Sequence, residues 1–271
     1  MTAAFEFQQG RLPLLISMPH TGEALTPGIR QCLTEKALQL QDTDWHIARL
    51  YHFAKEMGSS ILAANYSRYV IDLNRPEDDQ PLYASATTGL FPDIDFDGLS
   101  LYKPGMIPAA EERTRAIEQI WRPYHQKIRD ELARMVETFG YALLFDAHSI
   151  RSHVPRLFEG KLPDYNLGTN SGESCDPSLA HALAETCEHF EGVSHVVNGR
   201  FKGGFITRCF GQPAIHCHAV QLELSQCNYM DEDYPFAFDE EVAGPTRERI
   251  QALLDTMLRW AQGHYSQGHH V

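Results

Sequence analysis

The stretch YALLFDAHS, residues 141–149, decides the fold, because it joins an apolar run directly to polar side chains. Tyr141–Phe145 is a continuous apolar segment of the length expected for a buried strand. Strands that are apolar on both faces are typical of parallel sheets covered by helices. Asp146 and His148 follow this run, and ligands of open α/β sheets bind beyond the carboxyl ends of the strands. The stretch therefore predicts a parallel sheet and the edge at which its site lies.

Strand and helix patterns alternate along the rest of the chain. Further strands are predicted at residues 12–18, 60–64, 69–73, 195–197 and 219–224. Apolar positions spaced three and four residues apart predict helices over residues 43–57, 109–138, 176–190 and 240–262. Pro123 lies inside the second of these helices and is expected to kink or split it. The order of elements predicts an α/β fold, a three-layer α/β/α sandwich around a mixed, largely parallel central sheet.

No internal repeat or linker divides the sequence, so residues 1–271 are expected to form a single domain. Residues 76–108 carry several prolines and little apolar periodicity, which predicts a long ordered loop. Residues 263–271 are polar and rich in histidine, and we expect this tail to be disordered.

The balance of charge excludes several classes of partner. The chain has a net charge of −13, with 43% hydrophobic and 22% charged residues, which indicates a globular rather than a disordered protein. Nucleic acids and anionic membrane surfaces both attract a basic face, so neither is expected as a partner. The longest apolar stretches are far shorter than the ~20 residues that span a bilayer. No sequence pattern indicates an oligomeric state.

The cysteines and the N-terminal segment indicate a cytoplasmic protein. Six cysteines are scattered along the chain without a C-x-x-C pair. This favours reduced thiols over a disulfide framework or a cysteine metal site. The opening segment MTAAFEFQQG has neither the basic nor the apolar part of a secretory signal.

Two histidines stand where predicted strands end. His20 follows the first strand in the segment PHTG, and His148 follows the strand quoted above. A single histidine in such a place is usually a hydrogen-bonded loop residue. Two of them on separate strands, each beside carboxylates, indicate a metal site. Catalytic zinc typically has three protein ligands in total, drawn from imidazoles and carboxylates, and an open fourth position for water.

The third metal ligand has three candidates in the sequence. Glu23 forms a His-x-x-Glu pair with the first histidine, and Asp44 lies at the start of the helix predicted after the first strand. Asp146 is two residues from the second histidine and therefore shares its face of the strand. Any of these acids could instead orient a ligand imidazole. Asp42 and Asp44 also have a simpler explanation as helix caps.

Glu223 is an acidic residue inside the predicted strand segment AVQLELS. Val220, Leu222 and Leu224 can face one side of the sheet, which leaves Glu223 on the other side. A carboxylate in a central strand near a metal-bound water is placed to act as general base and then as general acid. The alternative is a glutamate on a solvent-facing strand surface.

A group of basic and amide side chains surrounds the strand predicted over 69–73. Arg68, Asn74 and Arg75 supply two guanidinium groups and an amide, which together can grip a carboxylate or a developing oxyanion. Arg208, after two glycines in the segment GGFITR, is a further basic candidate. In an acidic protein such a pocket would attract a small anionic substrate. The alternative is that these arginines form ordinary ion pairs with neighbouring acids.

The chain resembles a known enzyme family in several of these segments. They are SMPHTG, DTDWHIARLY, SRYVIDLNRP, LYASATTGL, DAHS, NGRFKGGFITR and AVQLELSQ. In this order they resemble the N-formylglutamate amidohydrolases, or N-formylglutamate deformylases, from about Leu12 to Leu258. That family is similar in fold to the wider group of zinc carboxypeptidases and aspartoacylases, a phosphorylase/hydrolase-like α/β/α sandwich.

The resemblance implies a role for each candidate residue. His20 and His148 match zinc ligands, and Asp44, in the DTDW segment typical of the family, is preferred to Glu23 as the third ligand. Glu223 matches the catalytic base. The implied substrate-binding residues are Arg68, which also has a catalytic role, Asn74, Arg75 and, as a further candidate, Arg208.

The implied reaction is the hydrolysis of N-formyl-L-glutamate to formate and L-glutamate in histidine degradation, with one Zn²⁺ or another divalent ion as cofactor. One alternative is a zinc hydrolase of another N-acyl acidic amino acid, as in aspartoacylases or desuccinylases. A second is a non-catalytic domain that binds anions with the same arginines. The combination of two histidines, neighbouring acids and Glu223 favours an enzyme.

Overall fold

A seven-stranded mixed sheet crosses the part of the chain that the computed structural model describes, residues 2–82 and 88–266. The strands are β1 (Phe5–Gln8), β2 (Leu14–Met18), β3 (Ser60–Ala64), β4 (Ala142–Ile150), β5 (Tyr165–Gly168), β6 (His195–Val197) and β7 (Cys217–Ser225). Their order across the sheet is β1-β3-β2-β4-β7-β5-β6. Strands β3, β2, β4 and β7 are parallel to one another, whereas β1 and β5 run antiparallel to their neighbours β3 and β7.

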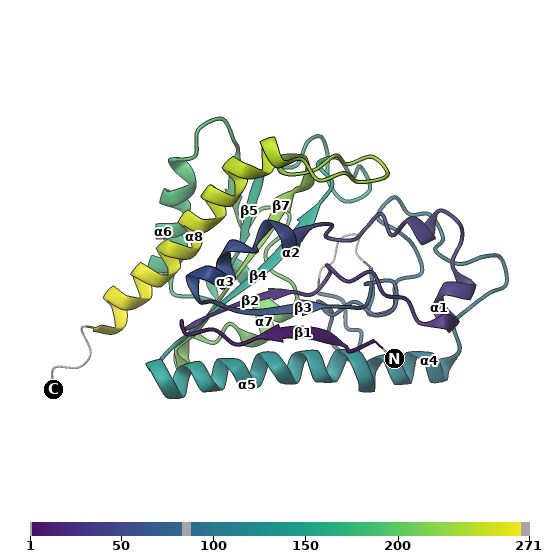
Figure 1. Cartoon of the computed structure of the whole chain (residues 1–271), viewed down its shortest axis with the longest axis horizontal. Helices are drawn as coiled ribbons and strands as arrows, with labels where there is room; N and C mark the ends of the chain where they lie inside the picture. Colours follow the sequence, from purple (N-terminus) through teal and green to yellow (C-terminus); the bar gives the residue numbers. More distant parts are fainter. Residues whose placement is uncertain (1, 83–87, 267–271) are drawn as a thin grey trace.

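Helices cover both faces of this sheet. They are α1 (Pro27–Cys32), α2 (Ile47–Leu50), α3 (Phe53–Met57), α4 (Ala110–Ala116), α5 (Arg122–Phe139), α6 (Pro177–Glu188), α7 (Phe205–Phe210) and α8 (Glu240–Ser266). Short 3₁₀ turns lie at Ala37–Gln39, Asn170–Gly172, Pro213–Ile215 and Gln226–Asn228. In Figure 1, α5 runs below the sheet, and α2, α3, α6 and α8 lie above it. The predicted three-layer α/β/α sandwich with a mixed sheet is therefore confirmed.

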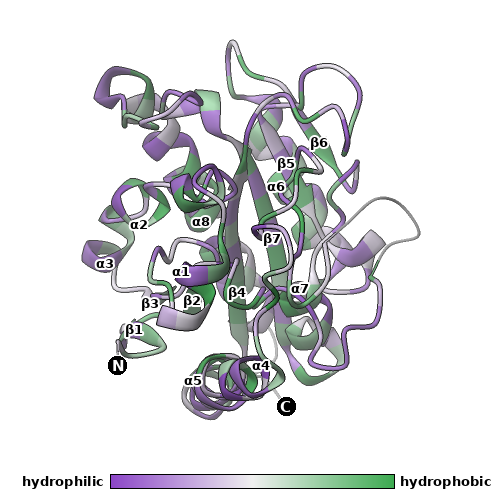
Figure 2. Ribbon diagram, turned by 90° about the vertical axis from the view of Figure 1, so that its right-hand side faces the viewer, coloured by the Kyte–Doolittle hydropathy of each residue, from purple (hydrophilic) through white to green (hydrophobic). Residues whose placement is uncertain are grey.

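The two faces of the central strands differ in a way that positions the site. On the face under α2, α3, α6 and α8, β4 is apolar from Leu143 to Ala147, with Leu143, Phe145 and Ala147 in one buried cluster. On the opposite face, Leu144 belongs to the second cluster, and His148 lies further along the strand. Figure 2 shows β4 and β7 as largely hydrophobic strands at the centre of the molecule. The polar residues of β4 are thus gathered toward its carboxyl end, at Asp146, His148 and Ser149.

Strand β7 repeats the pattern of β4 beside it. Val220, Leu222 and Leu224 lie in the same cluster as the apolar face of β4, as the sequence predicted. The parallel register pairs Glu223 with His148. Because side chains alternate along a strand, both point to the face opposite that cluster. Glu223 is only 8% exposed, which rules out the alternative of a solvent-facing glutamate.

Two predicted elements are wrong in their local structure. Residues 69–73 form turns rather than a strand. The segment bends back from Ser67, whose carbonyl accepts the Val70 N–H, so that its apolar side chains enter the second buried cluster while Asp72 points inward. The helix predicted over 43–57 is divided into α2 and α3, and it starts late because His46 has a left-handed backbone with φ of 61°. Strands β1 and β5 and helices α1 and α7 were not predicted.

The long helix predicted over 109–138 is continuous but contains a π turn at Ile117–Trp121. Helix α5 then starts at Arg122, so that Pro123, which has no N–H to donate to a helical carbonyl, lies directly after the π turn. The wider turn directs the Trp121 indole N–H to the carbonyl oxygen of Arg75 at 2.9 Å. A kink at Pro123 is thus replaced by a local change of helical register that supports residue 75.

The loop and tail predictions have mixed outcomes. The described parts of the 76–108 loop contain no helix or strand beyond isolated bridges such as Ile94 with Ser100, as predicted. Helix α8 continues to Ser266, and His264 stacks on Trp260 with ring centroids 4.7 Å apart. The disorder predicted from residue 263 is therefore wrong as far as residue 266, and the rest of the tail, with residues 83–87 of the loop, lies outside the described residues.

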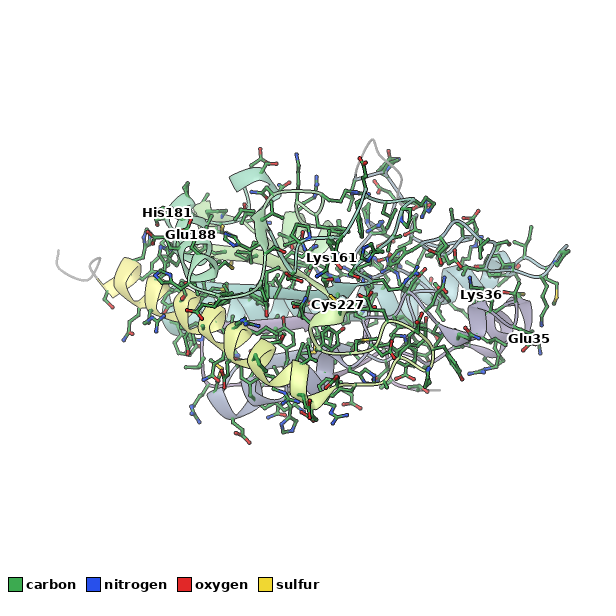
Figure 3. The ribbon with its side chains drawn as sticks, turned by 90° about the horizontal axis from the view of Figure 1, so that it is seen from above. Glu35, Lys36, Lys161, His181, Glu188 and Cys227 are labelled. Atoms are coloured by element: carbon green, nitrogen blue, oxygen red, sulfur yellow. The ribbon has the colours of Figure 1, made fainter. Side chains whose placement is uncertain are left out.

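All six cysteines are free thiols, as predicted. Figure 3 shows Cys227 near Lys161 over the middle of the molecule, whereas His181 and Glu188 of α6 lie toward one end. Among the described helices, none combines the length and the apolar character that a bilayer crossing requires.

The bond from Trp121 to Arg75 gives a test of the support beneath the 74–75 turn. Trp121→Phe should lower the free energy of unfolding by about 1–2 kcal/mol, since a buried hydrogen bond is lost and the ring becomes smaller. Urea denaturation measures this difference. Trp260→Phe is the matched control, because its indole N–H bonds Ser178 at an exposed position, where water can replace the partner. Equal losses in the two variants would contradict the role of Trp121.

Candidate metal and substrate site

A pocket opens at the carboxyl ends of β2, β4 and β7. The side chains around it come from six separate stretches of the chain. They are His20, Arg68, Asn74, Arg75, Thr88, Phe96, His148, Ile150, Arg156, Leu157, Arg200, Phe201, Gly204, Gln221 and Glu223. The edge of the sheet predicted from residues 141–149 is therefore where the pocket lies.

Three buried side chains form a group that can hold a metal ion. Ligand atoms of His20, Asp44 and His148 all lie within 4.8 Å of one another. Asp44 Oδ2 is 3.2 Å from His148 Nδ1 and 3.9 Å from His20 Nδ1. The other oxygen, Asp44 Oδ1, is buried without a hydrogen-bond partner among the described residues. An unpartnered buried carboxylate oxygen beside two imidazoles fits a cation-binding site.

The backbone explains why Asp44 rather than Glu23 belongs to this group. The Asp44 N–H donates to the carbonyl oxygen of His20 at 3.0 Å, which ties the two loops together. Glu23 lies one residue past Gly22, where a Cβ atom would come 2.4 Å from the Tyr66 carbonyl oxygen. The close approach carries the following residues along the 65–67 segment, and Glu23 is exposed. The third sequence candidate, Asp146, lies at the Nε2 side of the His148 imidazole, opposite the Nδ1 atom that faces Asp44.

Each histidine turns its second ring nitrogen to a buried carboxylate. His20 Nε2 lies 2.7 Å from Asp72 Oδ1, and His148 Nε2 lies 3.0 Å from Asp146 Oδ2. A proton on His20 Nε2 satisfies its bond to Asp72 and leaves His20 Nδ1 as a lone-pair donor toward Asp44, and His148 Nδ1 faces Asp44 as well. Carboxylates that bind the outer nitrogen of a ligand imidazole are a regular feature of metal sites. Asp146 is thus placed to orient His148.

Burial and charge act on these groups in opposite directions. Burial, together with the nearby Arg68 charge, lowers the pKa of His20. Burial alone would lower the pKa of His148 too, but the carboxylates of Asp146 and Asp44 raise it well above its usual value. Burial opposes the charged form of Asp72, yet Arg68 and His20 hold its pKa well below the ordinary range. In this arrangement the imidazolium form of His148 balances the acids, a role that a cation can take over.

Glu223 lies across from His148 in a buried, nearly closed environment. Burial raises its pKa to about 8, against the opposing effect of the His148 charge. Gln221 Nε2 donates to Glu223 Oε2 at 3.3 Å. A carboxyl group with a pKa near neutrality can both accept and release a proton, which is what a general acid–base catalyst needs.

Asp72 joins the histidine group to the arginine group. Its two oxygens accept from His20, from Arg68 Nη2 at 2.6 Å and from the Asn74 backbone N–H at 2.9 Å. Arg68 also lies over the Phe96 ring, with 4.6 Å from Cζ to the centroid. Arg68 thus pairs with the neighbouring acid Asp72, as the alternative expected, but the pair is buried and not at the surface, and it fixes Arg68 at the pocket.

Asn74 and Arg75 are held in one turn beside the second histidine. Asn74 Nδ2 lies 2.9 Å from His148 Nε2, and its Oδ1 accepts the Ile206 N–H at 2.9 Å. Residue 204 must be glycine for this arrangement, since a Cβ there would come 2.2 Å from Asn74 Nδ2. Arg75 donates through Nε to the Thr88 carbonyl oxygen at 2.7 Å and reaches the pocket.

Arg208 is the sequence candidate that the pocket does not include. It lies in α7 and donates through Nε to the Gly203 carbonyl oxygen at 2.8 Å. Arg156 and Arg200 line the pocket instead, and neither was predicted. Arg200 belongs to the same segment, NGRFKGGFITR, as the predicted Arg208. Arg156 lies in the loop between β4 and β5, six residues past the end of β4, and no sequence pattern marks it as a site residue.

The arrangement combines three chemical capacities in one place. Two imidazoles and a carboxylate can hold a cation, a buried carboxyl group can transfer a proton, and four arginines among the lining residues can bind an anion. Together they suit hydrolysis of a small anionic molecule.

Comparison with known proteins agrees with a site for hydrolysis. Residues 12–230 match the N-formylglutamate amidohydrolase family. A protein of Pseudomonas aeruginosa named N-formylglutamate deformylase is 60% identical over 266 residues, which cover 98% of this chain and 100% of that protein. A protein of the same name from Pseudomonas putida is 58% identical, also over 98% of this chain and 100% of its own length.

A solved structure supports the fold. The crystal structure of N-formylglutamate amidohydrolase from Ralstonia eutropha JMP134 superposes with a TM-score of 0.80 at 22% identity, covering 98% of this chain and 100% of that chain. The family match spans most of the sequence, and the two relatives are similar over nearly all of it. This chain therefore belongs to the N-formylglutamate amidohydrolase family.

Proposed function

We propose that this protein is a zinc-dependent N-formylglutamate deformylase, which hydrolyses N-formyl-L-glutamate to formate and L-glutamate. The observation that carries the proposal is the convergence of His20, Asp44 and His148 on one point, beside Glu223 and a pocket lined by arginines. The names of the two relatives, 60% and 58% identical over 98% of the chain, support the substrate.

The donor set favours zinc among the common metals. Two imidazole nitrogens with one carboxylate are a regular ligand set of catalytic zinc, whereas Mg²⁺ and Ca²⁺ prefer oxygen ligands throughout. A zinc ion held by these residues would supply Lewis acidity, which lowers the pKa of water toward ~7 and polarises a carbonyl oxygen. Asp72 and Asp146, each bonded to the outer nitrogen of one histidine, would fix the imidazoles for that task.

The protein's own residues then divide the remaining work. As the oxygen of the attacking water bonds to the formyl carbon, Glu223 accepts a proton from that water. Arg68 stabilises the negative charge that develops on the formyl oxygen. When the carbon–nitrogen bond breaks, Glu223 returns the proton to the leaving amine. Arg75 and Asn74 hold the α-carboxylate, which fixes the amide next to Glu223. Water is consumed, and formate and glutamate are the products.

The biological setting follows from the same proposal. Release of glutamate from its N-formyl derivative would place the enzyme at the end of a histidine-degradation route. The six free thiols fit a reducing compartment, and we propose the cytoplasm.

The metal ligands can be tested by zinc binding alone. Asp44→Asn should weaken Zn²⁺ binding strongly, because the charged ligand is lost, and Asp72→Asn should weaken it by about 10- to 100-fold through the misoriented His20. Equilibrium titration against a chromophoric chelator gives the affinities. Glu23→Gln is the control at the exposed alternative and should bind as the parent does. Loss of binding in Glu23→Gln with retention in Asp44→Asn would reverse the ligand assignment.

The catalytic role of Glu223 can be separated from metal binding. Glu223→Gln should reduce formate release from N-formyl-L-glutamate by at least about 10²-fold, since the group that transfers the proton is lost. Zinc content after gel filtration should stay near one ion per chain. A variant that loses zinc together with activity would make Glu223 a ligand instead of the base.

The substrate itself needs a direct comparison. The purified protein should release the acid most rapidly from N-formyl-L-glutamate in a panel that includes N-acetyl-L-aspartate and N-succinyl-L-glutamate. A chelator such as 1,10-phenanthroline should abolish turnover, and added Zn²⁺ should restore it. Faster hydrolysis of a larger acyl group would favour the alternative, a hydrolase of another N-acyl acidic amino acid.

A further inference from the structure

A second pair of arginines, Arg156 and Arg200, lies in the pocket outside the set that the reaction chemistry uses. Arg68 and Asn74 contact the two histidines directly, at 3.4 Å and 2.9 Å. Arg156 and Arg200 instead come from two loops that follow β4 and β6. The proposed mechanism gives them no task.

The two side chains are fixed on one wall of the pocket. Arg156 donates through Nε to the Phe96 carbonyl oxygen at 2.9 Å, and Arg200 donates through Nε to the Leu157 carbonyl oxygen at 2.7 Å. Because residue 157 is the neighbour of Arg156, the second bond places Arg200 beside Arg156. Phe96 and Leu157 line the same pocket, so the guanidinium groups adjoin an apolar surface.

The charges of the pocket call for an anion with more than one acidic group. Four arginines line it, and among the described lining residues Glu223 is the only carboxylate. Arg68 is balanced by Asp72, with which it forms a buried ion pair at 2.6 Å. Arg156 forms no ion pair within residues 2–82 and 88–266, and its bonds go to main-chain carbonyls of residues 95 and 96. A guanidinium group held in this way presents its charge to a ligand.

We propose that Arg156 and Arg200 bind the side-chain carboxylate of the substrate and so determine its specificity for an acidic amino acid. The inference rests on the proposed deformylase function, in which Arg75 and Asn74 take the α-carboxylate next to the reacting amide. The substrate's methylene groups then pass along Phe96 and Leu157. The anchored guanidinium groups set the distance at which a second carboxylate is accepted.

The test compares two substrates that differ only in that group. N-formyl-L-glutamine replaces the side-chain carboxylate by a neutral amide of the same shape. The ratio of kcat/KM for N-formyl-L-glutamate to that for N-formyl-L-glutamine should fall by about 10- to 100-fold in Arg156→Gln and in Arg200→Gln. Since both substrates are measured on the same preparation, the ratio does not depend on how much of a variant is folded.

Arg151→Gln is the matched control. Arg151 pairs with Asp97 at 2.9 Å and so tethers the same loop as Arg156, but it does not line the pocket. Its ratio should equal that of the parent. Arg156→Lys and Arg200→Lys, which keep the charge and lose the planar donor pair, should give intermediate ratios and serve if the glutamine variants do not fold.

The outcomes separate the inference from the function on which it rests. A parent enzyme that releases formate, with an unchanged ratio in the Arg156 and Arg200 variants, overturns the inference and leaves the deformylase function intact. An equal fall of the ratio in Arg151→Gln also overturns it, because the loop and not the charge would then be responsible. A parent enzyme that releases no formate from either compound overturns both proposals.

Discussion

The buried pairing of Asp72 and Asp146 with the two histidines is the interaction on which the rest of the site depends. Burying a carboxylate costs several kcal/mol unless it is bonded to a positive or donating partner. Here each acid takes the outer nitrogen of one imidazole, and Asp72 also takes Arg68 and the Asn74 backbone N–H. The same bonds that make the burial tolerable turn both Nδ1 atoms toward Asp44. The direction of the candidate metal site is thus a consequence of charge compensation, and Asp72 couples it to the turn that carries Asn74 and Arg75.

That turn has no regular secondary structure of its own, so its precision comes from its neighbours. The π turn before α5 brings Trp121 to the Arg75 carbonyl oxygen. From the other side, the Ile206 N–H at the start of α7 binds the Asn74 side chain, and the absence of a side chain at Gly204 allows the close approach. Loops that carry function are commonly positioned by a rigid scaffold. In this protein part of that scaffold is the π turn at Ile117–Trp121, which lies inside a long helix directly before Pro123.

How much of this could be predicted depends on how local the signal is. β4 was found because its apolar run is continuous, and β7 because its apolar residues alternate with polar ones, and the polar residues of both strands located the site. The strand predicted over 69–73 failed because its apolar side chains are buried by a turn around Asp72, and the tertiary contact of that one acid is invisible to a periodicity argument. The choice between Glu23 and Asp44 depended on the contact of Gly22 with Tyr66. Arg156 and Arg200 are attached to main-chain carbonyls of distant residues, a relation that leaves no pattern in the sequence.

The charge distribution of the whole molecule requires the arginines to do more than bind. A protein of net charge −13 repels a dianion at long range, and Asp44, Asp72 and Asp146 are buried against the two histidines that line the pocket. His148 and Arg68 offset part of this negative charge locally, and the arginines at the wall supply the positive field that a ligand meets in the pocket. A field of this kind favours binding of a ligand with two carboxylates over a ligand with one. Each carboxylate is attracted only at a position close to a guanidinium group, so the two positions are fixed. Electrostatics would therefore keep the charged groups of a ligand at the arginines and away from the metal-ligand candidates. A carboxylate placed against Asp44 would be repelled, whereas a neutral formyl amide would not.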